Sequence, residues 1–174
     1  MKEARDARRI LELARERDGA HPLPLGVMGL SMGGAIVCRL AFEEPSAVRA
    51  VVVDSVYSHL FPVLARAIRE RYDIPAFPWA WVTWWSLQIA LMRCLATCDP
   101  AVLAPRLHQP LLAIQGGEDR RVVPLLGREF YRRWAGTKER WFVPEAAHVG
   151  TFAQHPEEYC RRVADFFERV FARS

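Results

Sequence analysis

The spacing of apolar residues along this chain alternates between a helical period and short unbroken runs. Apolar positions recur every three or four residues in several segments, which is the spacing of one buried helix face. The helices predicted from this spacing cover residues 2–17, 32–43, 125–134 and 157–172. Uninterrupted apolar runs bounded by turn residues predict strands at 25–30, 50–53, 111–115 and 140–143.

The order of these elements predicts an α/β fold. Strands alternate with helices, which is typical of a parallel sheet with right-handed crossovers and helices on both faces. The run AVVV at residues 50–53 is apolar throughout, as expected of a strand that is covered on both sides. A length of 174 residues predicts one domain over residues 1–174, with a mostly helical insertion over residues 57–108.

Part of the insertion is so apolar that a membrane span has to be considered. Residues 74–92 read IPAFPWAWVTWWSLQIALM and carry no charge. A spanning helix needs about 20 apolar residues, and the proline-free part of this stretch, residues 79–92, is too short. We therefore expect an amphipathic helix that is buried or forms a lid, and we do not expect contact with a membrane.

Composition and charge exclude some classes of protein. The net charge is +4, but the basic residues are spread along predicted helices beside acidic ones, so we expect no nucleic-acid partner. None of the four cysteines (Cys38, Cys94, Cys98 and Cys160) belongs to a CxxC pair. No metal or other cofactor is predicted. With no signal peptide at the charged N-terminus, the cysteine pattern predicts a reducing, cytoplasmic setting.

The first strand leads into a serine flanked by glycines, in the order Gly29-Leu30-Ser31-Met32-Gly33. A serine in a tight strand-to-helix turn takes a strained backbone, and close approach of the neighbouring chain requires small residues on either side. We expect Gly29 and Gly33 to meet that need. Such a turn projects the Ser31 hydroxyl above the sheet and directs the Met32 N–H at an oxyanion formed in a reaction.

Two later strands supply the groups that such a serine requires. Asp119 follows the third strand in IQGGEDRRVVP, and His148 follows the fourth in FVPEAAHVG. A serine hydroxyl needs a general base, and an imidazole needs a carboxylate that selects its tautomer and stabilises its cation. Each motif alone is common in loops, and the placement of all three after strands carries the prediction. Asp54, at the end of the second strand, is an alternative acid or else a turn cap.

These motifs together resemble the α/β-hydrolase superfamily, of the esterase, lipase and serine aminopeptidase kind. GLSMGG resembles its nucleophile elbow, AAHVG its histidine loop, and GGED followed by VVP its acid loop, with one extra residue between Asp119 and Pro124. The resemblance implies that Ser31 is the nucleophile, Asp119 the acid, His148 the base, and the Met32 N–H an oxyanion donor. A few family members place the acid at the position of Asp54.

The resemblance extends to the insertion, which corresponds to the helical cap of the family. Such caps shape the substrate pocket. The tryptophans of the insertion either line an apolar site or pack as a helical stripe, and both alternatives stay open: Trp79, Trp81, Trp84 and Trp85.

The resemblance covers the family's C-terminal portion, from the helix before the elbow onward. The N-terminal strands, and the loop that gives the second oxyanion donor, have no counterpart, so we expect a partial fold with the strand at 25–30 on an edge. We expect a fragment or a gene model begun at an internal Met. A missing half supplied by another chain and a non-catalytic remnant are the alternatives. The isolated chain is then expected to be poorly soluble or nearly inactive.

The predicted function is that of a serine hydrolase that cleaves carboxylic esters, or amides, through an acyl-enzyme on Ser31. Its partner would be a small-molecule substrate. The alternative is a non-catalytic α/β module that binds a partner, or a second copy of itself, through the open edge of the sheet. An exposed apolar edge strand is a template for such pairing.

Overall fold

The strands form a four-stranded parallel sheet in the order β1-β2-β3-β4. The computed structural model describes residues 6–13, 25–91 and 99–172. The strands are β1 (Leu25–Leu30), β2 (Val48–Asp54), β3 (Leu111–Gly116) and β4 (Lys138–Val143). All four predicted strands are confirmed. β2 and β4 each begin two residues earlier than predicted, because ladder pairing extends into polar positions that an apolar run does not mark.

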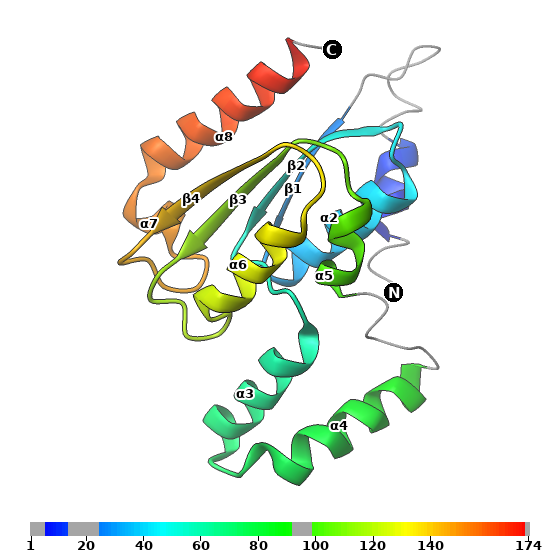
Figure 1. Ribbon diagram of the computed structural model, residues 1–174, viewed down its shortest axis with the longest axis vertical. Helices are drawn as coiled ribbons and strands as arrows, with labels where there is room; N and C mark the ends of the chain where they lie inside the picture. Colours follow the sequence, from blue (N-terminus) through cyan, green and yellow to red (C-terminus); the bar gives the residue numbers. More distant parts are fainter. Residues whose placement is uncertain (1–5, 14–24, 92–98, 173–174) are drawn as a thin grey trace.

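Helices cover both faces of this sheet, in three layers (Figure 1). They are α2 (Met32–Glu43), α3 (Leu60–Tyr72), α4 (Ala76–Leu91), α5 (Pro100–Leu103), α6 (Pro124–Arg133), α7 (Thr151–Gln154) and α8 (Pro156–Phe171), with a 3-10 turn at Ala104–Arg106. α6 and α8 both begin at a proline, whose fixed φ suits the first helical position. Of the helix predicted at residues 2–17, residues 6–13 are described and are helical.

Alternate residues of β2 enter two different hydrophobic clusters. Val51 and Val53 pack with α2 and α6, in a cluster that includes Phe130 and Trp134. Ala50 and Val52 face the opposite way and pack in the cluster that contains residues of α8. The alternation follows from the two-residue period of a strand. It confirms that this strand is covered on both faces.

β1 lies at one edge of the described sheet. It pairs with β2 from Leu25↔Val48 to Leu30↔Asp54, and among the described residues no strand pairs with its other side. This is the edge position predicted from the resemblance. Leu30 at its carboxyl end is exposed.

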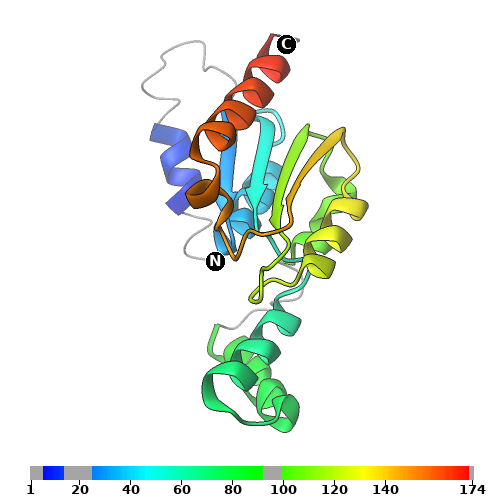
Figure 2. The ribbon, with the colours of Figure 1, turned by 90° about the vertical axis from the view of Figure 1, so that its left-hand side faces the viewer.

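α3 and α4 project beyond the carboxyl ends of the strands, away from the sheet (Figures 1 and 2). The two helices pack on each other through Phe61, whose ring centroid lies 4.7 Å from that of Trp81 and 5.5 Å from that of Trp84. Trp84 is buried there, whereas Trp79, Trp81 and Trp85 are exposed.

The described end of the predicted insertion, residues 100–107, packs with the sheet layers. Leu103, Ala104 and Leu107 are buried in the same cluster as Val51 and Trp134. Two of the four cysteines, Cys94 and Cys98, lie outside the described residues. We therefore propose that the cap consists of α3 and α4 rather than the whole of residues 57–108, and use the word in that sense below.

No helix within the described ranges has both the length and the apolar character needed to cross a bilayer. The apolar stretch at residues 74–92 forms α4, which covers Ala76–Leu91 and has a non-helical backbone at Phe77. Cys38 is a buried free thiol and Cys160 an exposed one.

Candidate active site

Ser31 occupies the sharp turn between β1 and α2. Its backbone has φ 50° and ψ −118°, a conformation that costs a residue with a side chain about 1–3 kcal/mol. A hydrogen bond to the neighbouring strand stabilises the turn, since the Ser31 N–H donates to the Asp54 carbonyl at 2.8 Å. Ser31 therefore stands at the N-terminus of α2 and at the carboxyl end of β1, where the sequence predicted it.

The two elbow glycines differ in what surrounds them. A Cβ at Gly29 would collide with the backbone of Gly33 and Gly34, so only glycine fits at this position. A Cβ at Gly33 would meet nothing within 4 Å among the described residues. The expectation that close approach requires both glycines is thus wrong for Gly33. Gly34 is instead the tight position, since a Cβ there would lie 2.9 Å from Cγ2 of Val56.

This difference predicts opposite effects of the same substitution. Gly29→Ala is expected to lower the free energy of unfolding by about 1–3 kcal/mol, because backbone atoms must move to admit the methyl group. Gly33→Ala is expected to raise it by up to about 1 kcal/mol, because alanine is the better helix residue and the space is open. Denaturant unfolding of both variants measures this, and a destabilising Gly33→Ala would contradict it.

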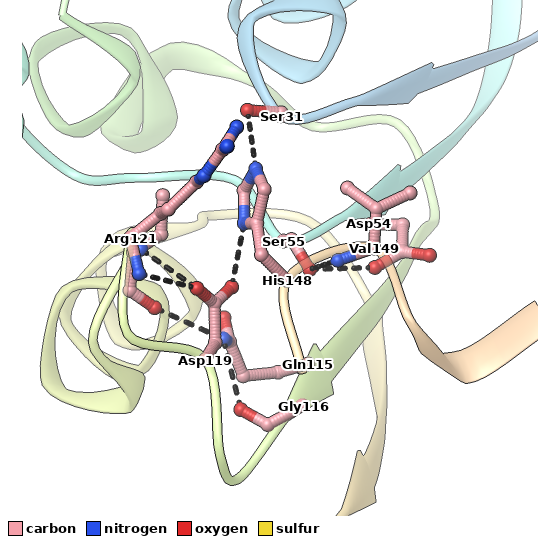
Figure 3. Close-up of polar contacts among 10 residues, drawn as sticks. Ser31, Asp54, Ser55, Gln115, Gly116, Asp119, Arg121, His148 and Val149 are labelled. Atoms are coloured by element: carbon pink, nitrogen blue, oxygen red, sulfur yellow. Dashed lines mark hydrogen bonds and ion pairs between the residues drawn. The ribbon is translucent and has the colours of Figure 1, made fainter. Parts of the chain in front are cut away.

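Ser31, His148 and Asp119 form one hydrogen-bonded chain (Figure 3). His148 Nε2 lies 2.9 Å from Ser31 Oγ, and His148 Nδ1 lies 2.8 Å from Asp119 Oδ2. If the carboxylate accepts the Nδ1 proton, Nε2 is left free to accept the serine proton. Residues separated in sequence by as many as 117 positions are thus brought together at the carboxyl ends of the strands.

The acid loop holds Asp119 in place through its second oxygen. Asp119 Oδ1 accepts the N–H groups of Arg121 at 2.9 Å and of Val122 at 2.8 Å. The side chain is fully buried, and it has three hydrogen-bond partners. The Glu118 N–H donates to the Ala146 carbonyl at 3.0 Å, which ties the acid loop to the histidine loop.

Asp54 is near this chain of residues but is held by other groups. Its two oxygens accept the hydroxyls of Ser55 and Tyr159, each at 2.9 Å. Burial raises the pKa of Asp54, and both hydroxyls oppose that shift. Burial and the nearby Asp54 carboxylate also raise the pKa of Tyr159, which keeps its phenol a donor. The carboxyl that contacts His148 is Asp119.

The network around Asp54 supports the histidine loop, and the sequence did not indicate it. Ser55 Oγ accepts the N–H of Val149, the residue after His148, at 3.0 Å (Figure 3). Ser55 and Val149 both have φ 55°, so each has an unfavourable backbone that these contacts hold. The only signal in the sequence was a serine directly after the aspartate that ends a strand.

Met32 is the first residue of α2, directly after Ser31. The first N–H groups of a helix have no partner within the helix, and the positive end of the helix dipole lies there. The Met32 N–H therefore lies at the positive end of the α2 dipole, one residue after Ser31. The Met32 side chain is exposed.

A cavity of about 510 Å³ adjoins Ser31 and His148. The acid loop contributes Arg121 and Val122 to its wall, and the remaining residues come from α3: Val63, Arg66, Ala67, Glu70 and Arg71. The four tryptophans of the cap are not among these lining residues. Within the described ranges, no group of three His, Cys, Asp or Glu side chains is arranged to hold a metal ion.

Comparison with known protein families identifies the family of this chain. The sequence pattern of the family described as "Alpha/beta hydrolase family" matches residues 2–162. The chain therefore belongs to the α/β-hydrolase family. No significant match was found among curated protein sequences.

Solved structures of this family superpose on most of the chain. An esterase of Pyrococcus furiosus, Pf2001, is 25% identical with a TM-score of 0.70, covering 98% of this chain and 62% of its own. A protein described as a non-haem bromoperoxidase, from Mycobacterium tuberculosis, is 22% identical with a TM-score of 0.66, covering 96% and 73%. A CIB-like hydrolase of Thermoplasma acidophilum is 17% identical with a TM-score of 0.61, covering 97% and 59%.

The chain matches only part of the length of each of these solved structures. It spans between 59% and 73% of the three structures named above, so the matched fold is a partial one. An identity below 25% shows the fold alone. Among the three structures, only the esterase is as much as 25% identical to this chain.

Proposed function

We propose that this chain is a serine hydrolase that cleaves carboxylic esters, and by the same chemistry amides, through an acyl-enzyme on Ser31. The observation that carries the proposal is the chain of contacts from Ser31 Oγ through His148 to the buried Asp119 carboxylate. The likeness to the Pyrococcus furiosus esterase supports the ester class of substrate. Because the chain matches only part of that esterase, the activity of the whole protein is part of the proposal.

Acylation starts with attack of Ser31 Oγ on the carbonyl carbon of the substrate. The hydroxyl proton passes to His148 Nε2, 2.9 Å away, and the C–O bond to Ser31 forms. Asp119 accepts the Nδ1–H throughout and stabilises the imidazolium. The Met32 N–H donates to the oxyanion. His148 then returns the proton to the leaving oxygen or nitrogen as its bond to carbon breaks.

Deacylation repeats these steps with water in place of the serine hydroxyl. His148 takes a proton from water, the resulting oxygen attacks the acyl carbon, and the Ser31 oxygen leaves with the proton that His148 returns. The carboxylic acid product departs and the starting state is restored. No metal or organic cofactor takes part in this sequence.

Covalent labelling tests the nucleophile directly. A fluorophosphonate probe is expected to label the wild-type protein at Ser31, because phosphonylation needs an activated serine and no particular substrate pocket. Peptide mass mapping of the product measures the site. His148→Ala is expected to prevent labelling, because it removes the base. A folded protein that remains unlabelled, or is labelled at another serine, would overturn the proposal.

A partner-binding module is the second candidate function. Among the described residues β1 has one unpaired side, and its last residue, Leu30, is exposed, as is Met32 just after it. These features favour strand addition or self-association there. The labelling experiment separates the two candidates, since a module without chemistry has no need of an activated serine.

A further inference from the structure

The wall of the cavity beside Ser31 carries an excess of positive charge. Three arginines line it, Arg66, Arg71 and Arg121, together with one carboxylate, Glu70. Arg66 Nε lies 2.7 Å from Glu70 Oε1, so these two side chains neutralise each other. Arg71 lies in the last turn of α3, where a basic residue also offsets the helix dipole. Neither an ion pair with Glu70 nor a position in the last turn of a helix accounts for the positive charge of Arg121 at this cavity.

The acid loop fixes the place from which the Arg121 side chain extends. The Arg121 N–H donates to Asp119 Oδ1 at 2.9 Å, so its backbone is tied to the carboxylate that contacts His148. Figure 3 shows the side chain running alongside His148 with its guanidinium toward Ser31. All three residues that frame this position, Ser31, Arg121 and His148, line the same cavity.

Nothing in the described part of the chain uses this guanidinium. Two carboxylates of the site pair with other groups in the described residues: Asp119 with His148, and Glu70 with Arg66. Val122 and Val63 give the cavity apolar surface as well. A cationic group on the same side of a partly apolar cavity as the nucleophile matches a substrate with a charged end and a short apolar linker.

We propose that Arg121 binds a carboxylate of the substrate, so that the protein prefers esters or amides that carry a negative charge close to the scissile bond. The planar guanidinium can hold a carboxylate by two parallel hydrogen bonds, which sets the distance to Ser31 as well as the charge preference. This inference rests on the proposed function, because it names the substrate class of the same site.

A pair of matched esters tests the charge preference. The probes are the p-nitrophenyl monoester of adipic acid, which is anionic, and its methyl-capped neutral counterpart. We expect kcat/KM to be about tenfold higher for the anionic ester, which is near the lower end of what a hydrogen bond to a charged group contributes. Arg121→Gln is expected to remove that ratio, and added salt is expected to shrink it in the wild type because Arg121 is exposed.

The neighbouring arginine provides the matched control. Arg120 is exposed on the same loop but is not among the residues that line the cavity beside Ser31. Arg120→Gln removes the same net charge from the protein, and it is expected to leave the ratio unchanged. A ratio near one in the wild type, or a ratio that Arg120→Gln lowers as much as Arg121→Gln does, would overturn the proposal.

Binding without turnover separates this inference from the proposed function. Calorimetric titration of Ser31→Ala with both esters is expected to give about tenfold tighter binding of the anionic one, and adding Arg121→Gln is expected to remove that difference. Equal affinities, or no measurable binding of the anionic ester, would overturn the inference. Preferential binding with no hydrolysis by the wild type would refute the proposed hydrolysis alone. Hydrolysis of both esters with equal efficiency would refute the charge preference alone.

Discussion

Replacing Ser31 with alanine is expected to lower kcat for a p-nitrophenyl ester by up to about 10⁶-fold, the loss measured when a triad serine is removed, and to leave a weakly active chain with no turnover above background. The reason is that Ser31 Oγ is the atom that forms the acyl-enzyme, and no other hydroxyl occupies its place 2.9 Å from His148 Nε2 in the described residues. Any residual turnover of the Ser31→Ala protein should come from the Met32 N–H and from substrate binding in the cavity alone. Stopped-flow or long-time absorbance measurements of nitrophenol release give the two rates.

The control is an exposed serine that lies away from the site. Ser46 lies in the turn before β2, at the opposite end of the sheet, and Ser46→Ala is expected to retain wild-type turnover. Thermal unfolding of both variants shows whether the fold is kept. A Ser31→Ala protein that folds normally and keeps more than a few per cent of the turnover would exclude an acyl-enzyme on Ser31.

Asp119→Asn is expected to lower kcat by about 10⁴-fold with little change in KM, as loss of the acid does in other serine triads. The structure determines how the new amide must sit. Because Oδ1 accepts the N–H groups of Arg121 and Val122, the amide oxygen takes that side. Its NH₂ group then faces His148 Nδ1 and donates to it, which leaves the proton on Nε2.

That tautomer cannot act as the base for Ser31, although the residues remain in contact. The expected signature is therefore a loss in kcat with an unchanged fold and an unchanged cavity. Fluorophosphonate labelling should slow in parallel, because it depends on the same proton transfer.

Asp54→Asn is the matched variant and decides between the two candidate acids. Asp54 contacts Ser55 and Tyr159 rather than His148, so its effect should be far smaller than that of Asp119→Asn and should act through the histidine loop. Greater loss of kcat in Asp54→Asn than in Asp119→Asn would reverse the assignment. The two variants carry the same chemical change, which makes the comparison direct.

The local pattern was sufficient for the order and type of the strands and of the helices between them, but it did not mark α3, α5 or α7 individually. Apolar runs marked all four strands, and the helical period marked α2, α6 and α8 within one or two residues at each end. Two observed boundaries differ from the predicted ones because strand pairing or a proline sets them. β4 begins at Lys138, which pairs with Leu111, and α8 begins at Pro156. Neither signal is carried by hydrophobic spacing.

The elbow shows where local reasoning was incomplete. A serine between glycines predicted the strained turn, which Ser31 has at φ 50°. Which glycine is essential depends on what packs against it, and that is a tertiary property. Gly29 faces the backbone of Gly33 and Gly34, whereas Gly33 faces open space in the described structure.

The amino-acid sequence by itself determined the layers of the fold, the chain order of Ser31, Asp119 and His148, and the strand ends at which they lie, because period and turn chemistry are local properties. Only the tertiary structure decided that Asp119 rather than Asp54 contacts His148. It also brought Arg121 to the cavity and gave Ser55 its contact with Val149. Those outcomes depend on which loops meet above the sheet, and spacing along a single chain does not encode the distance between side chains from different strands.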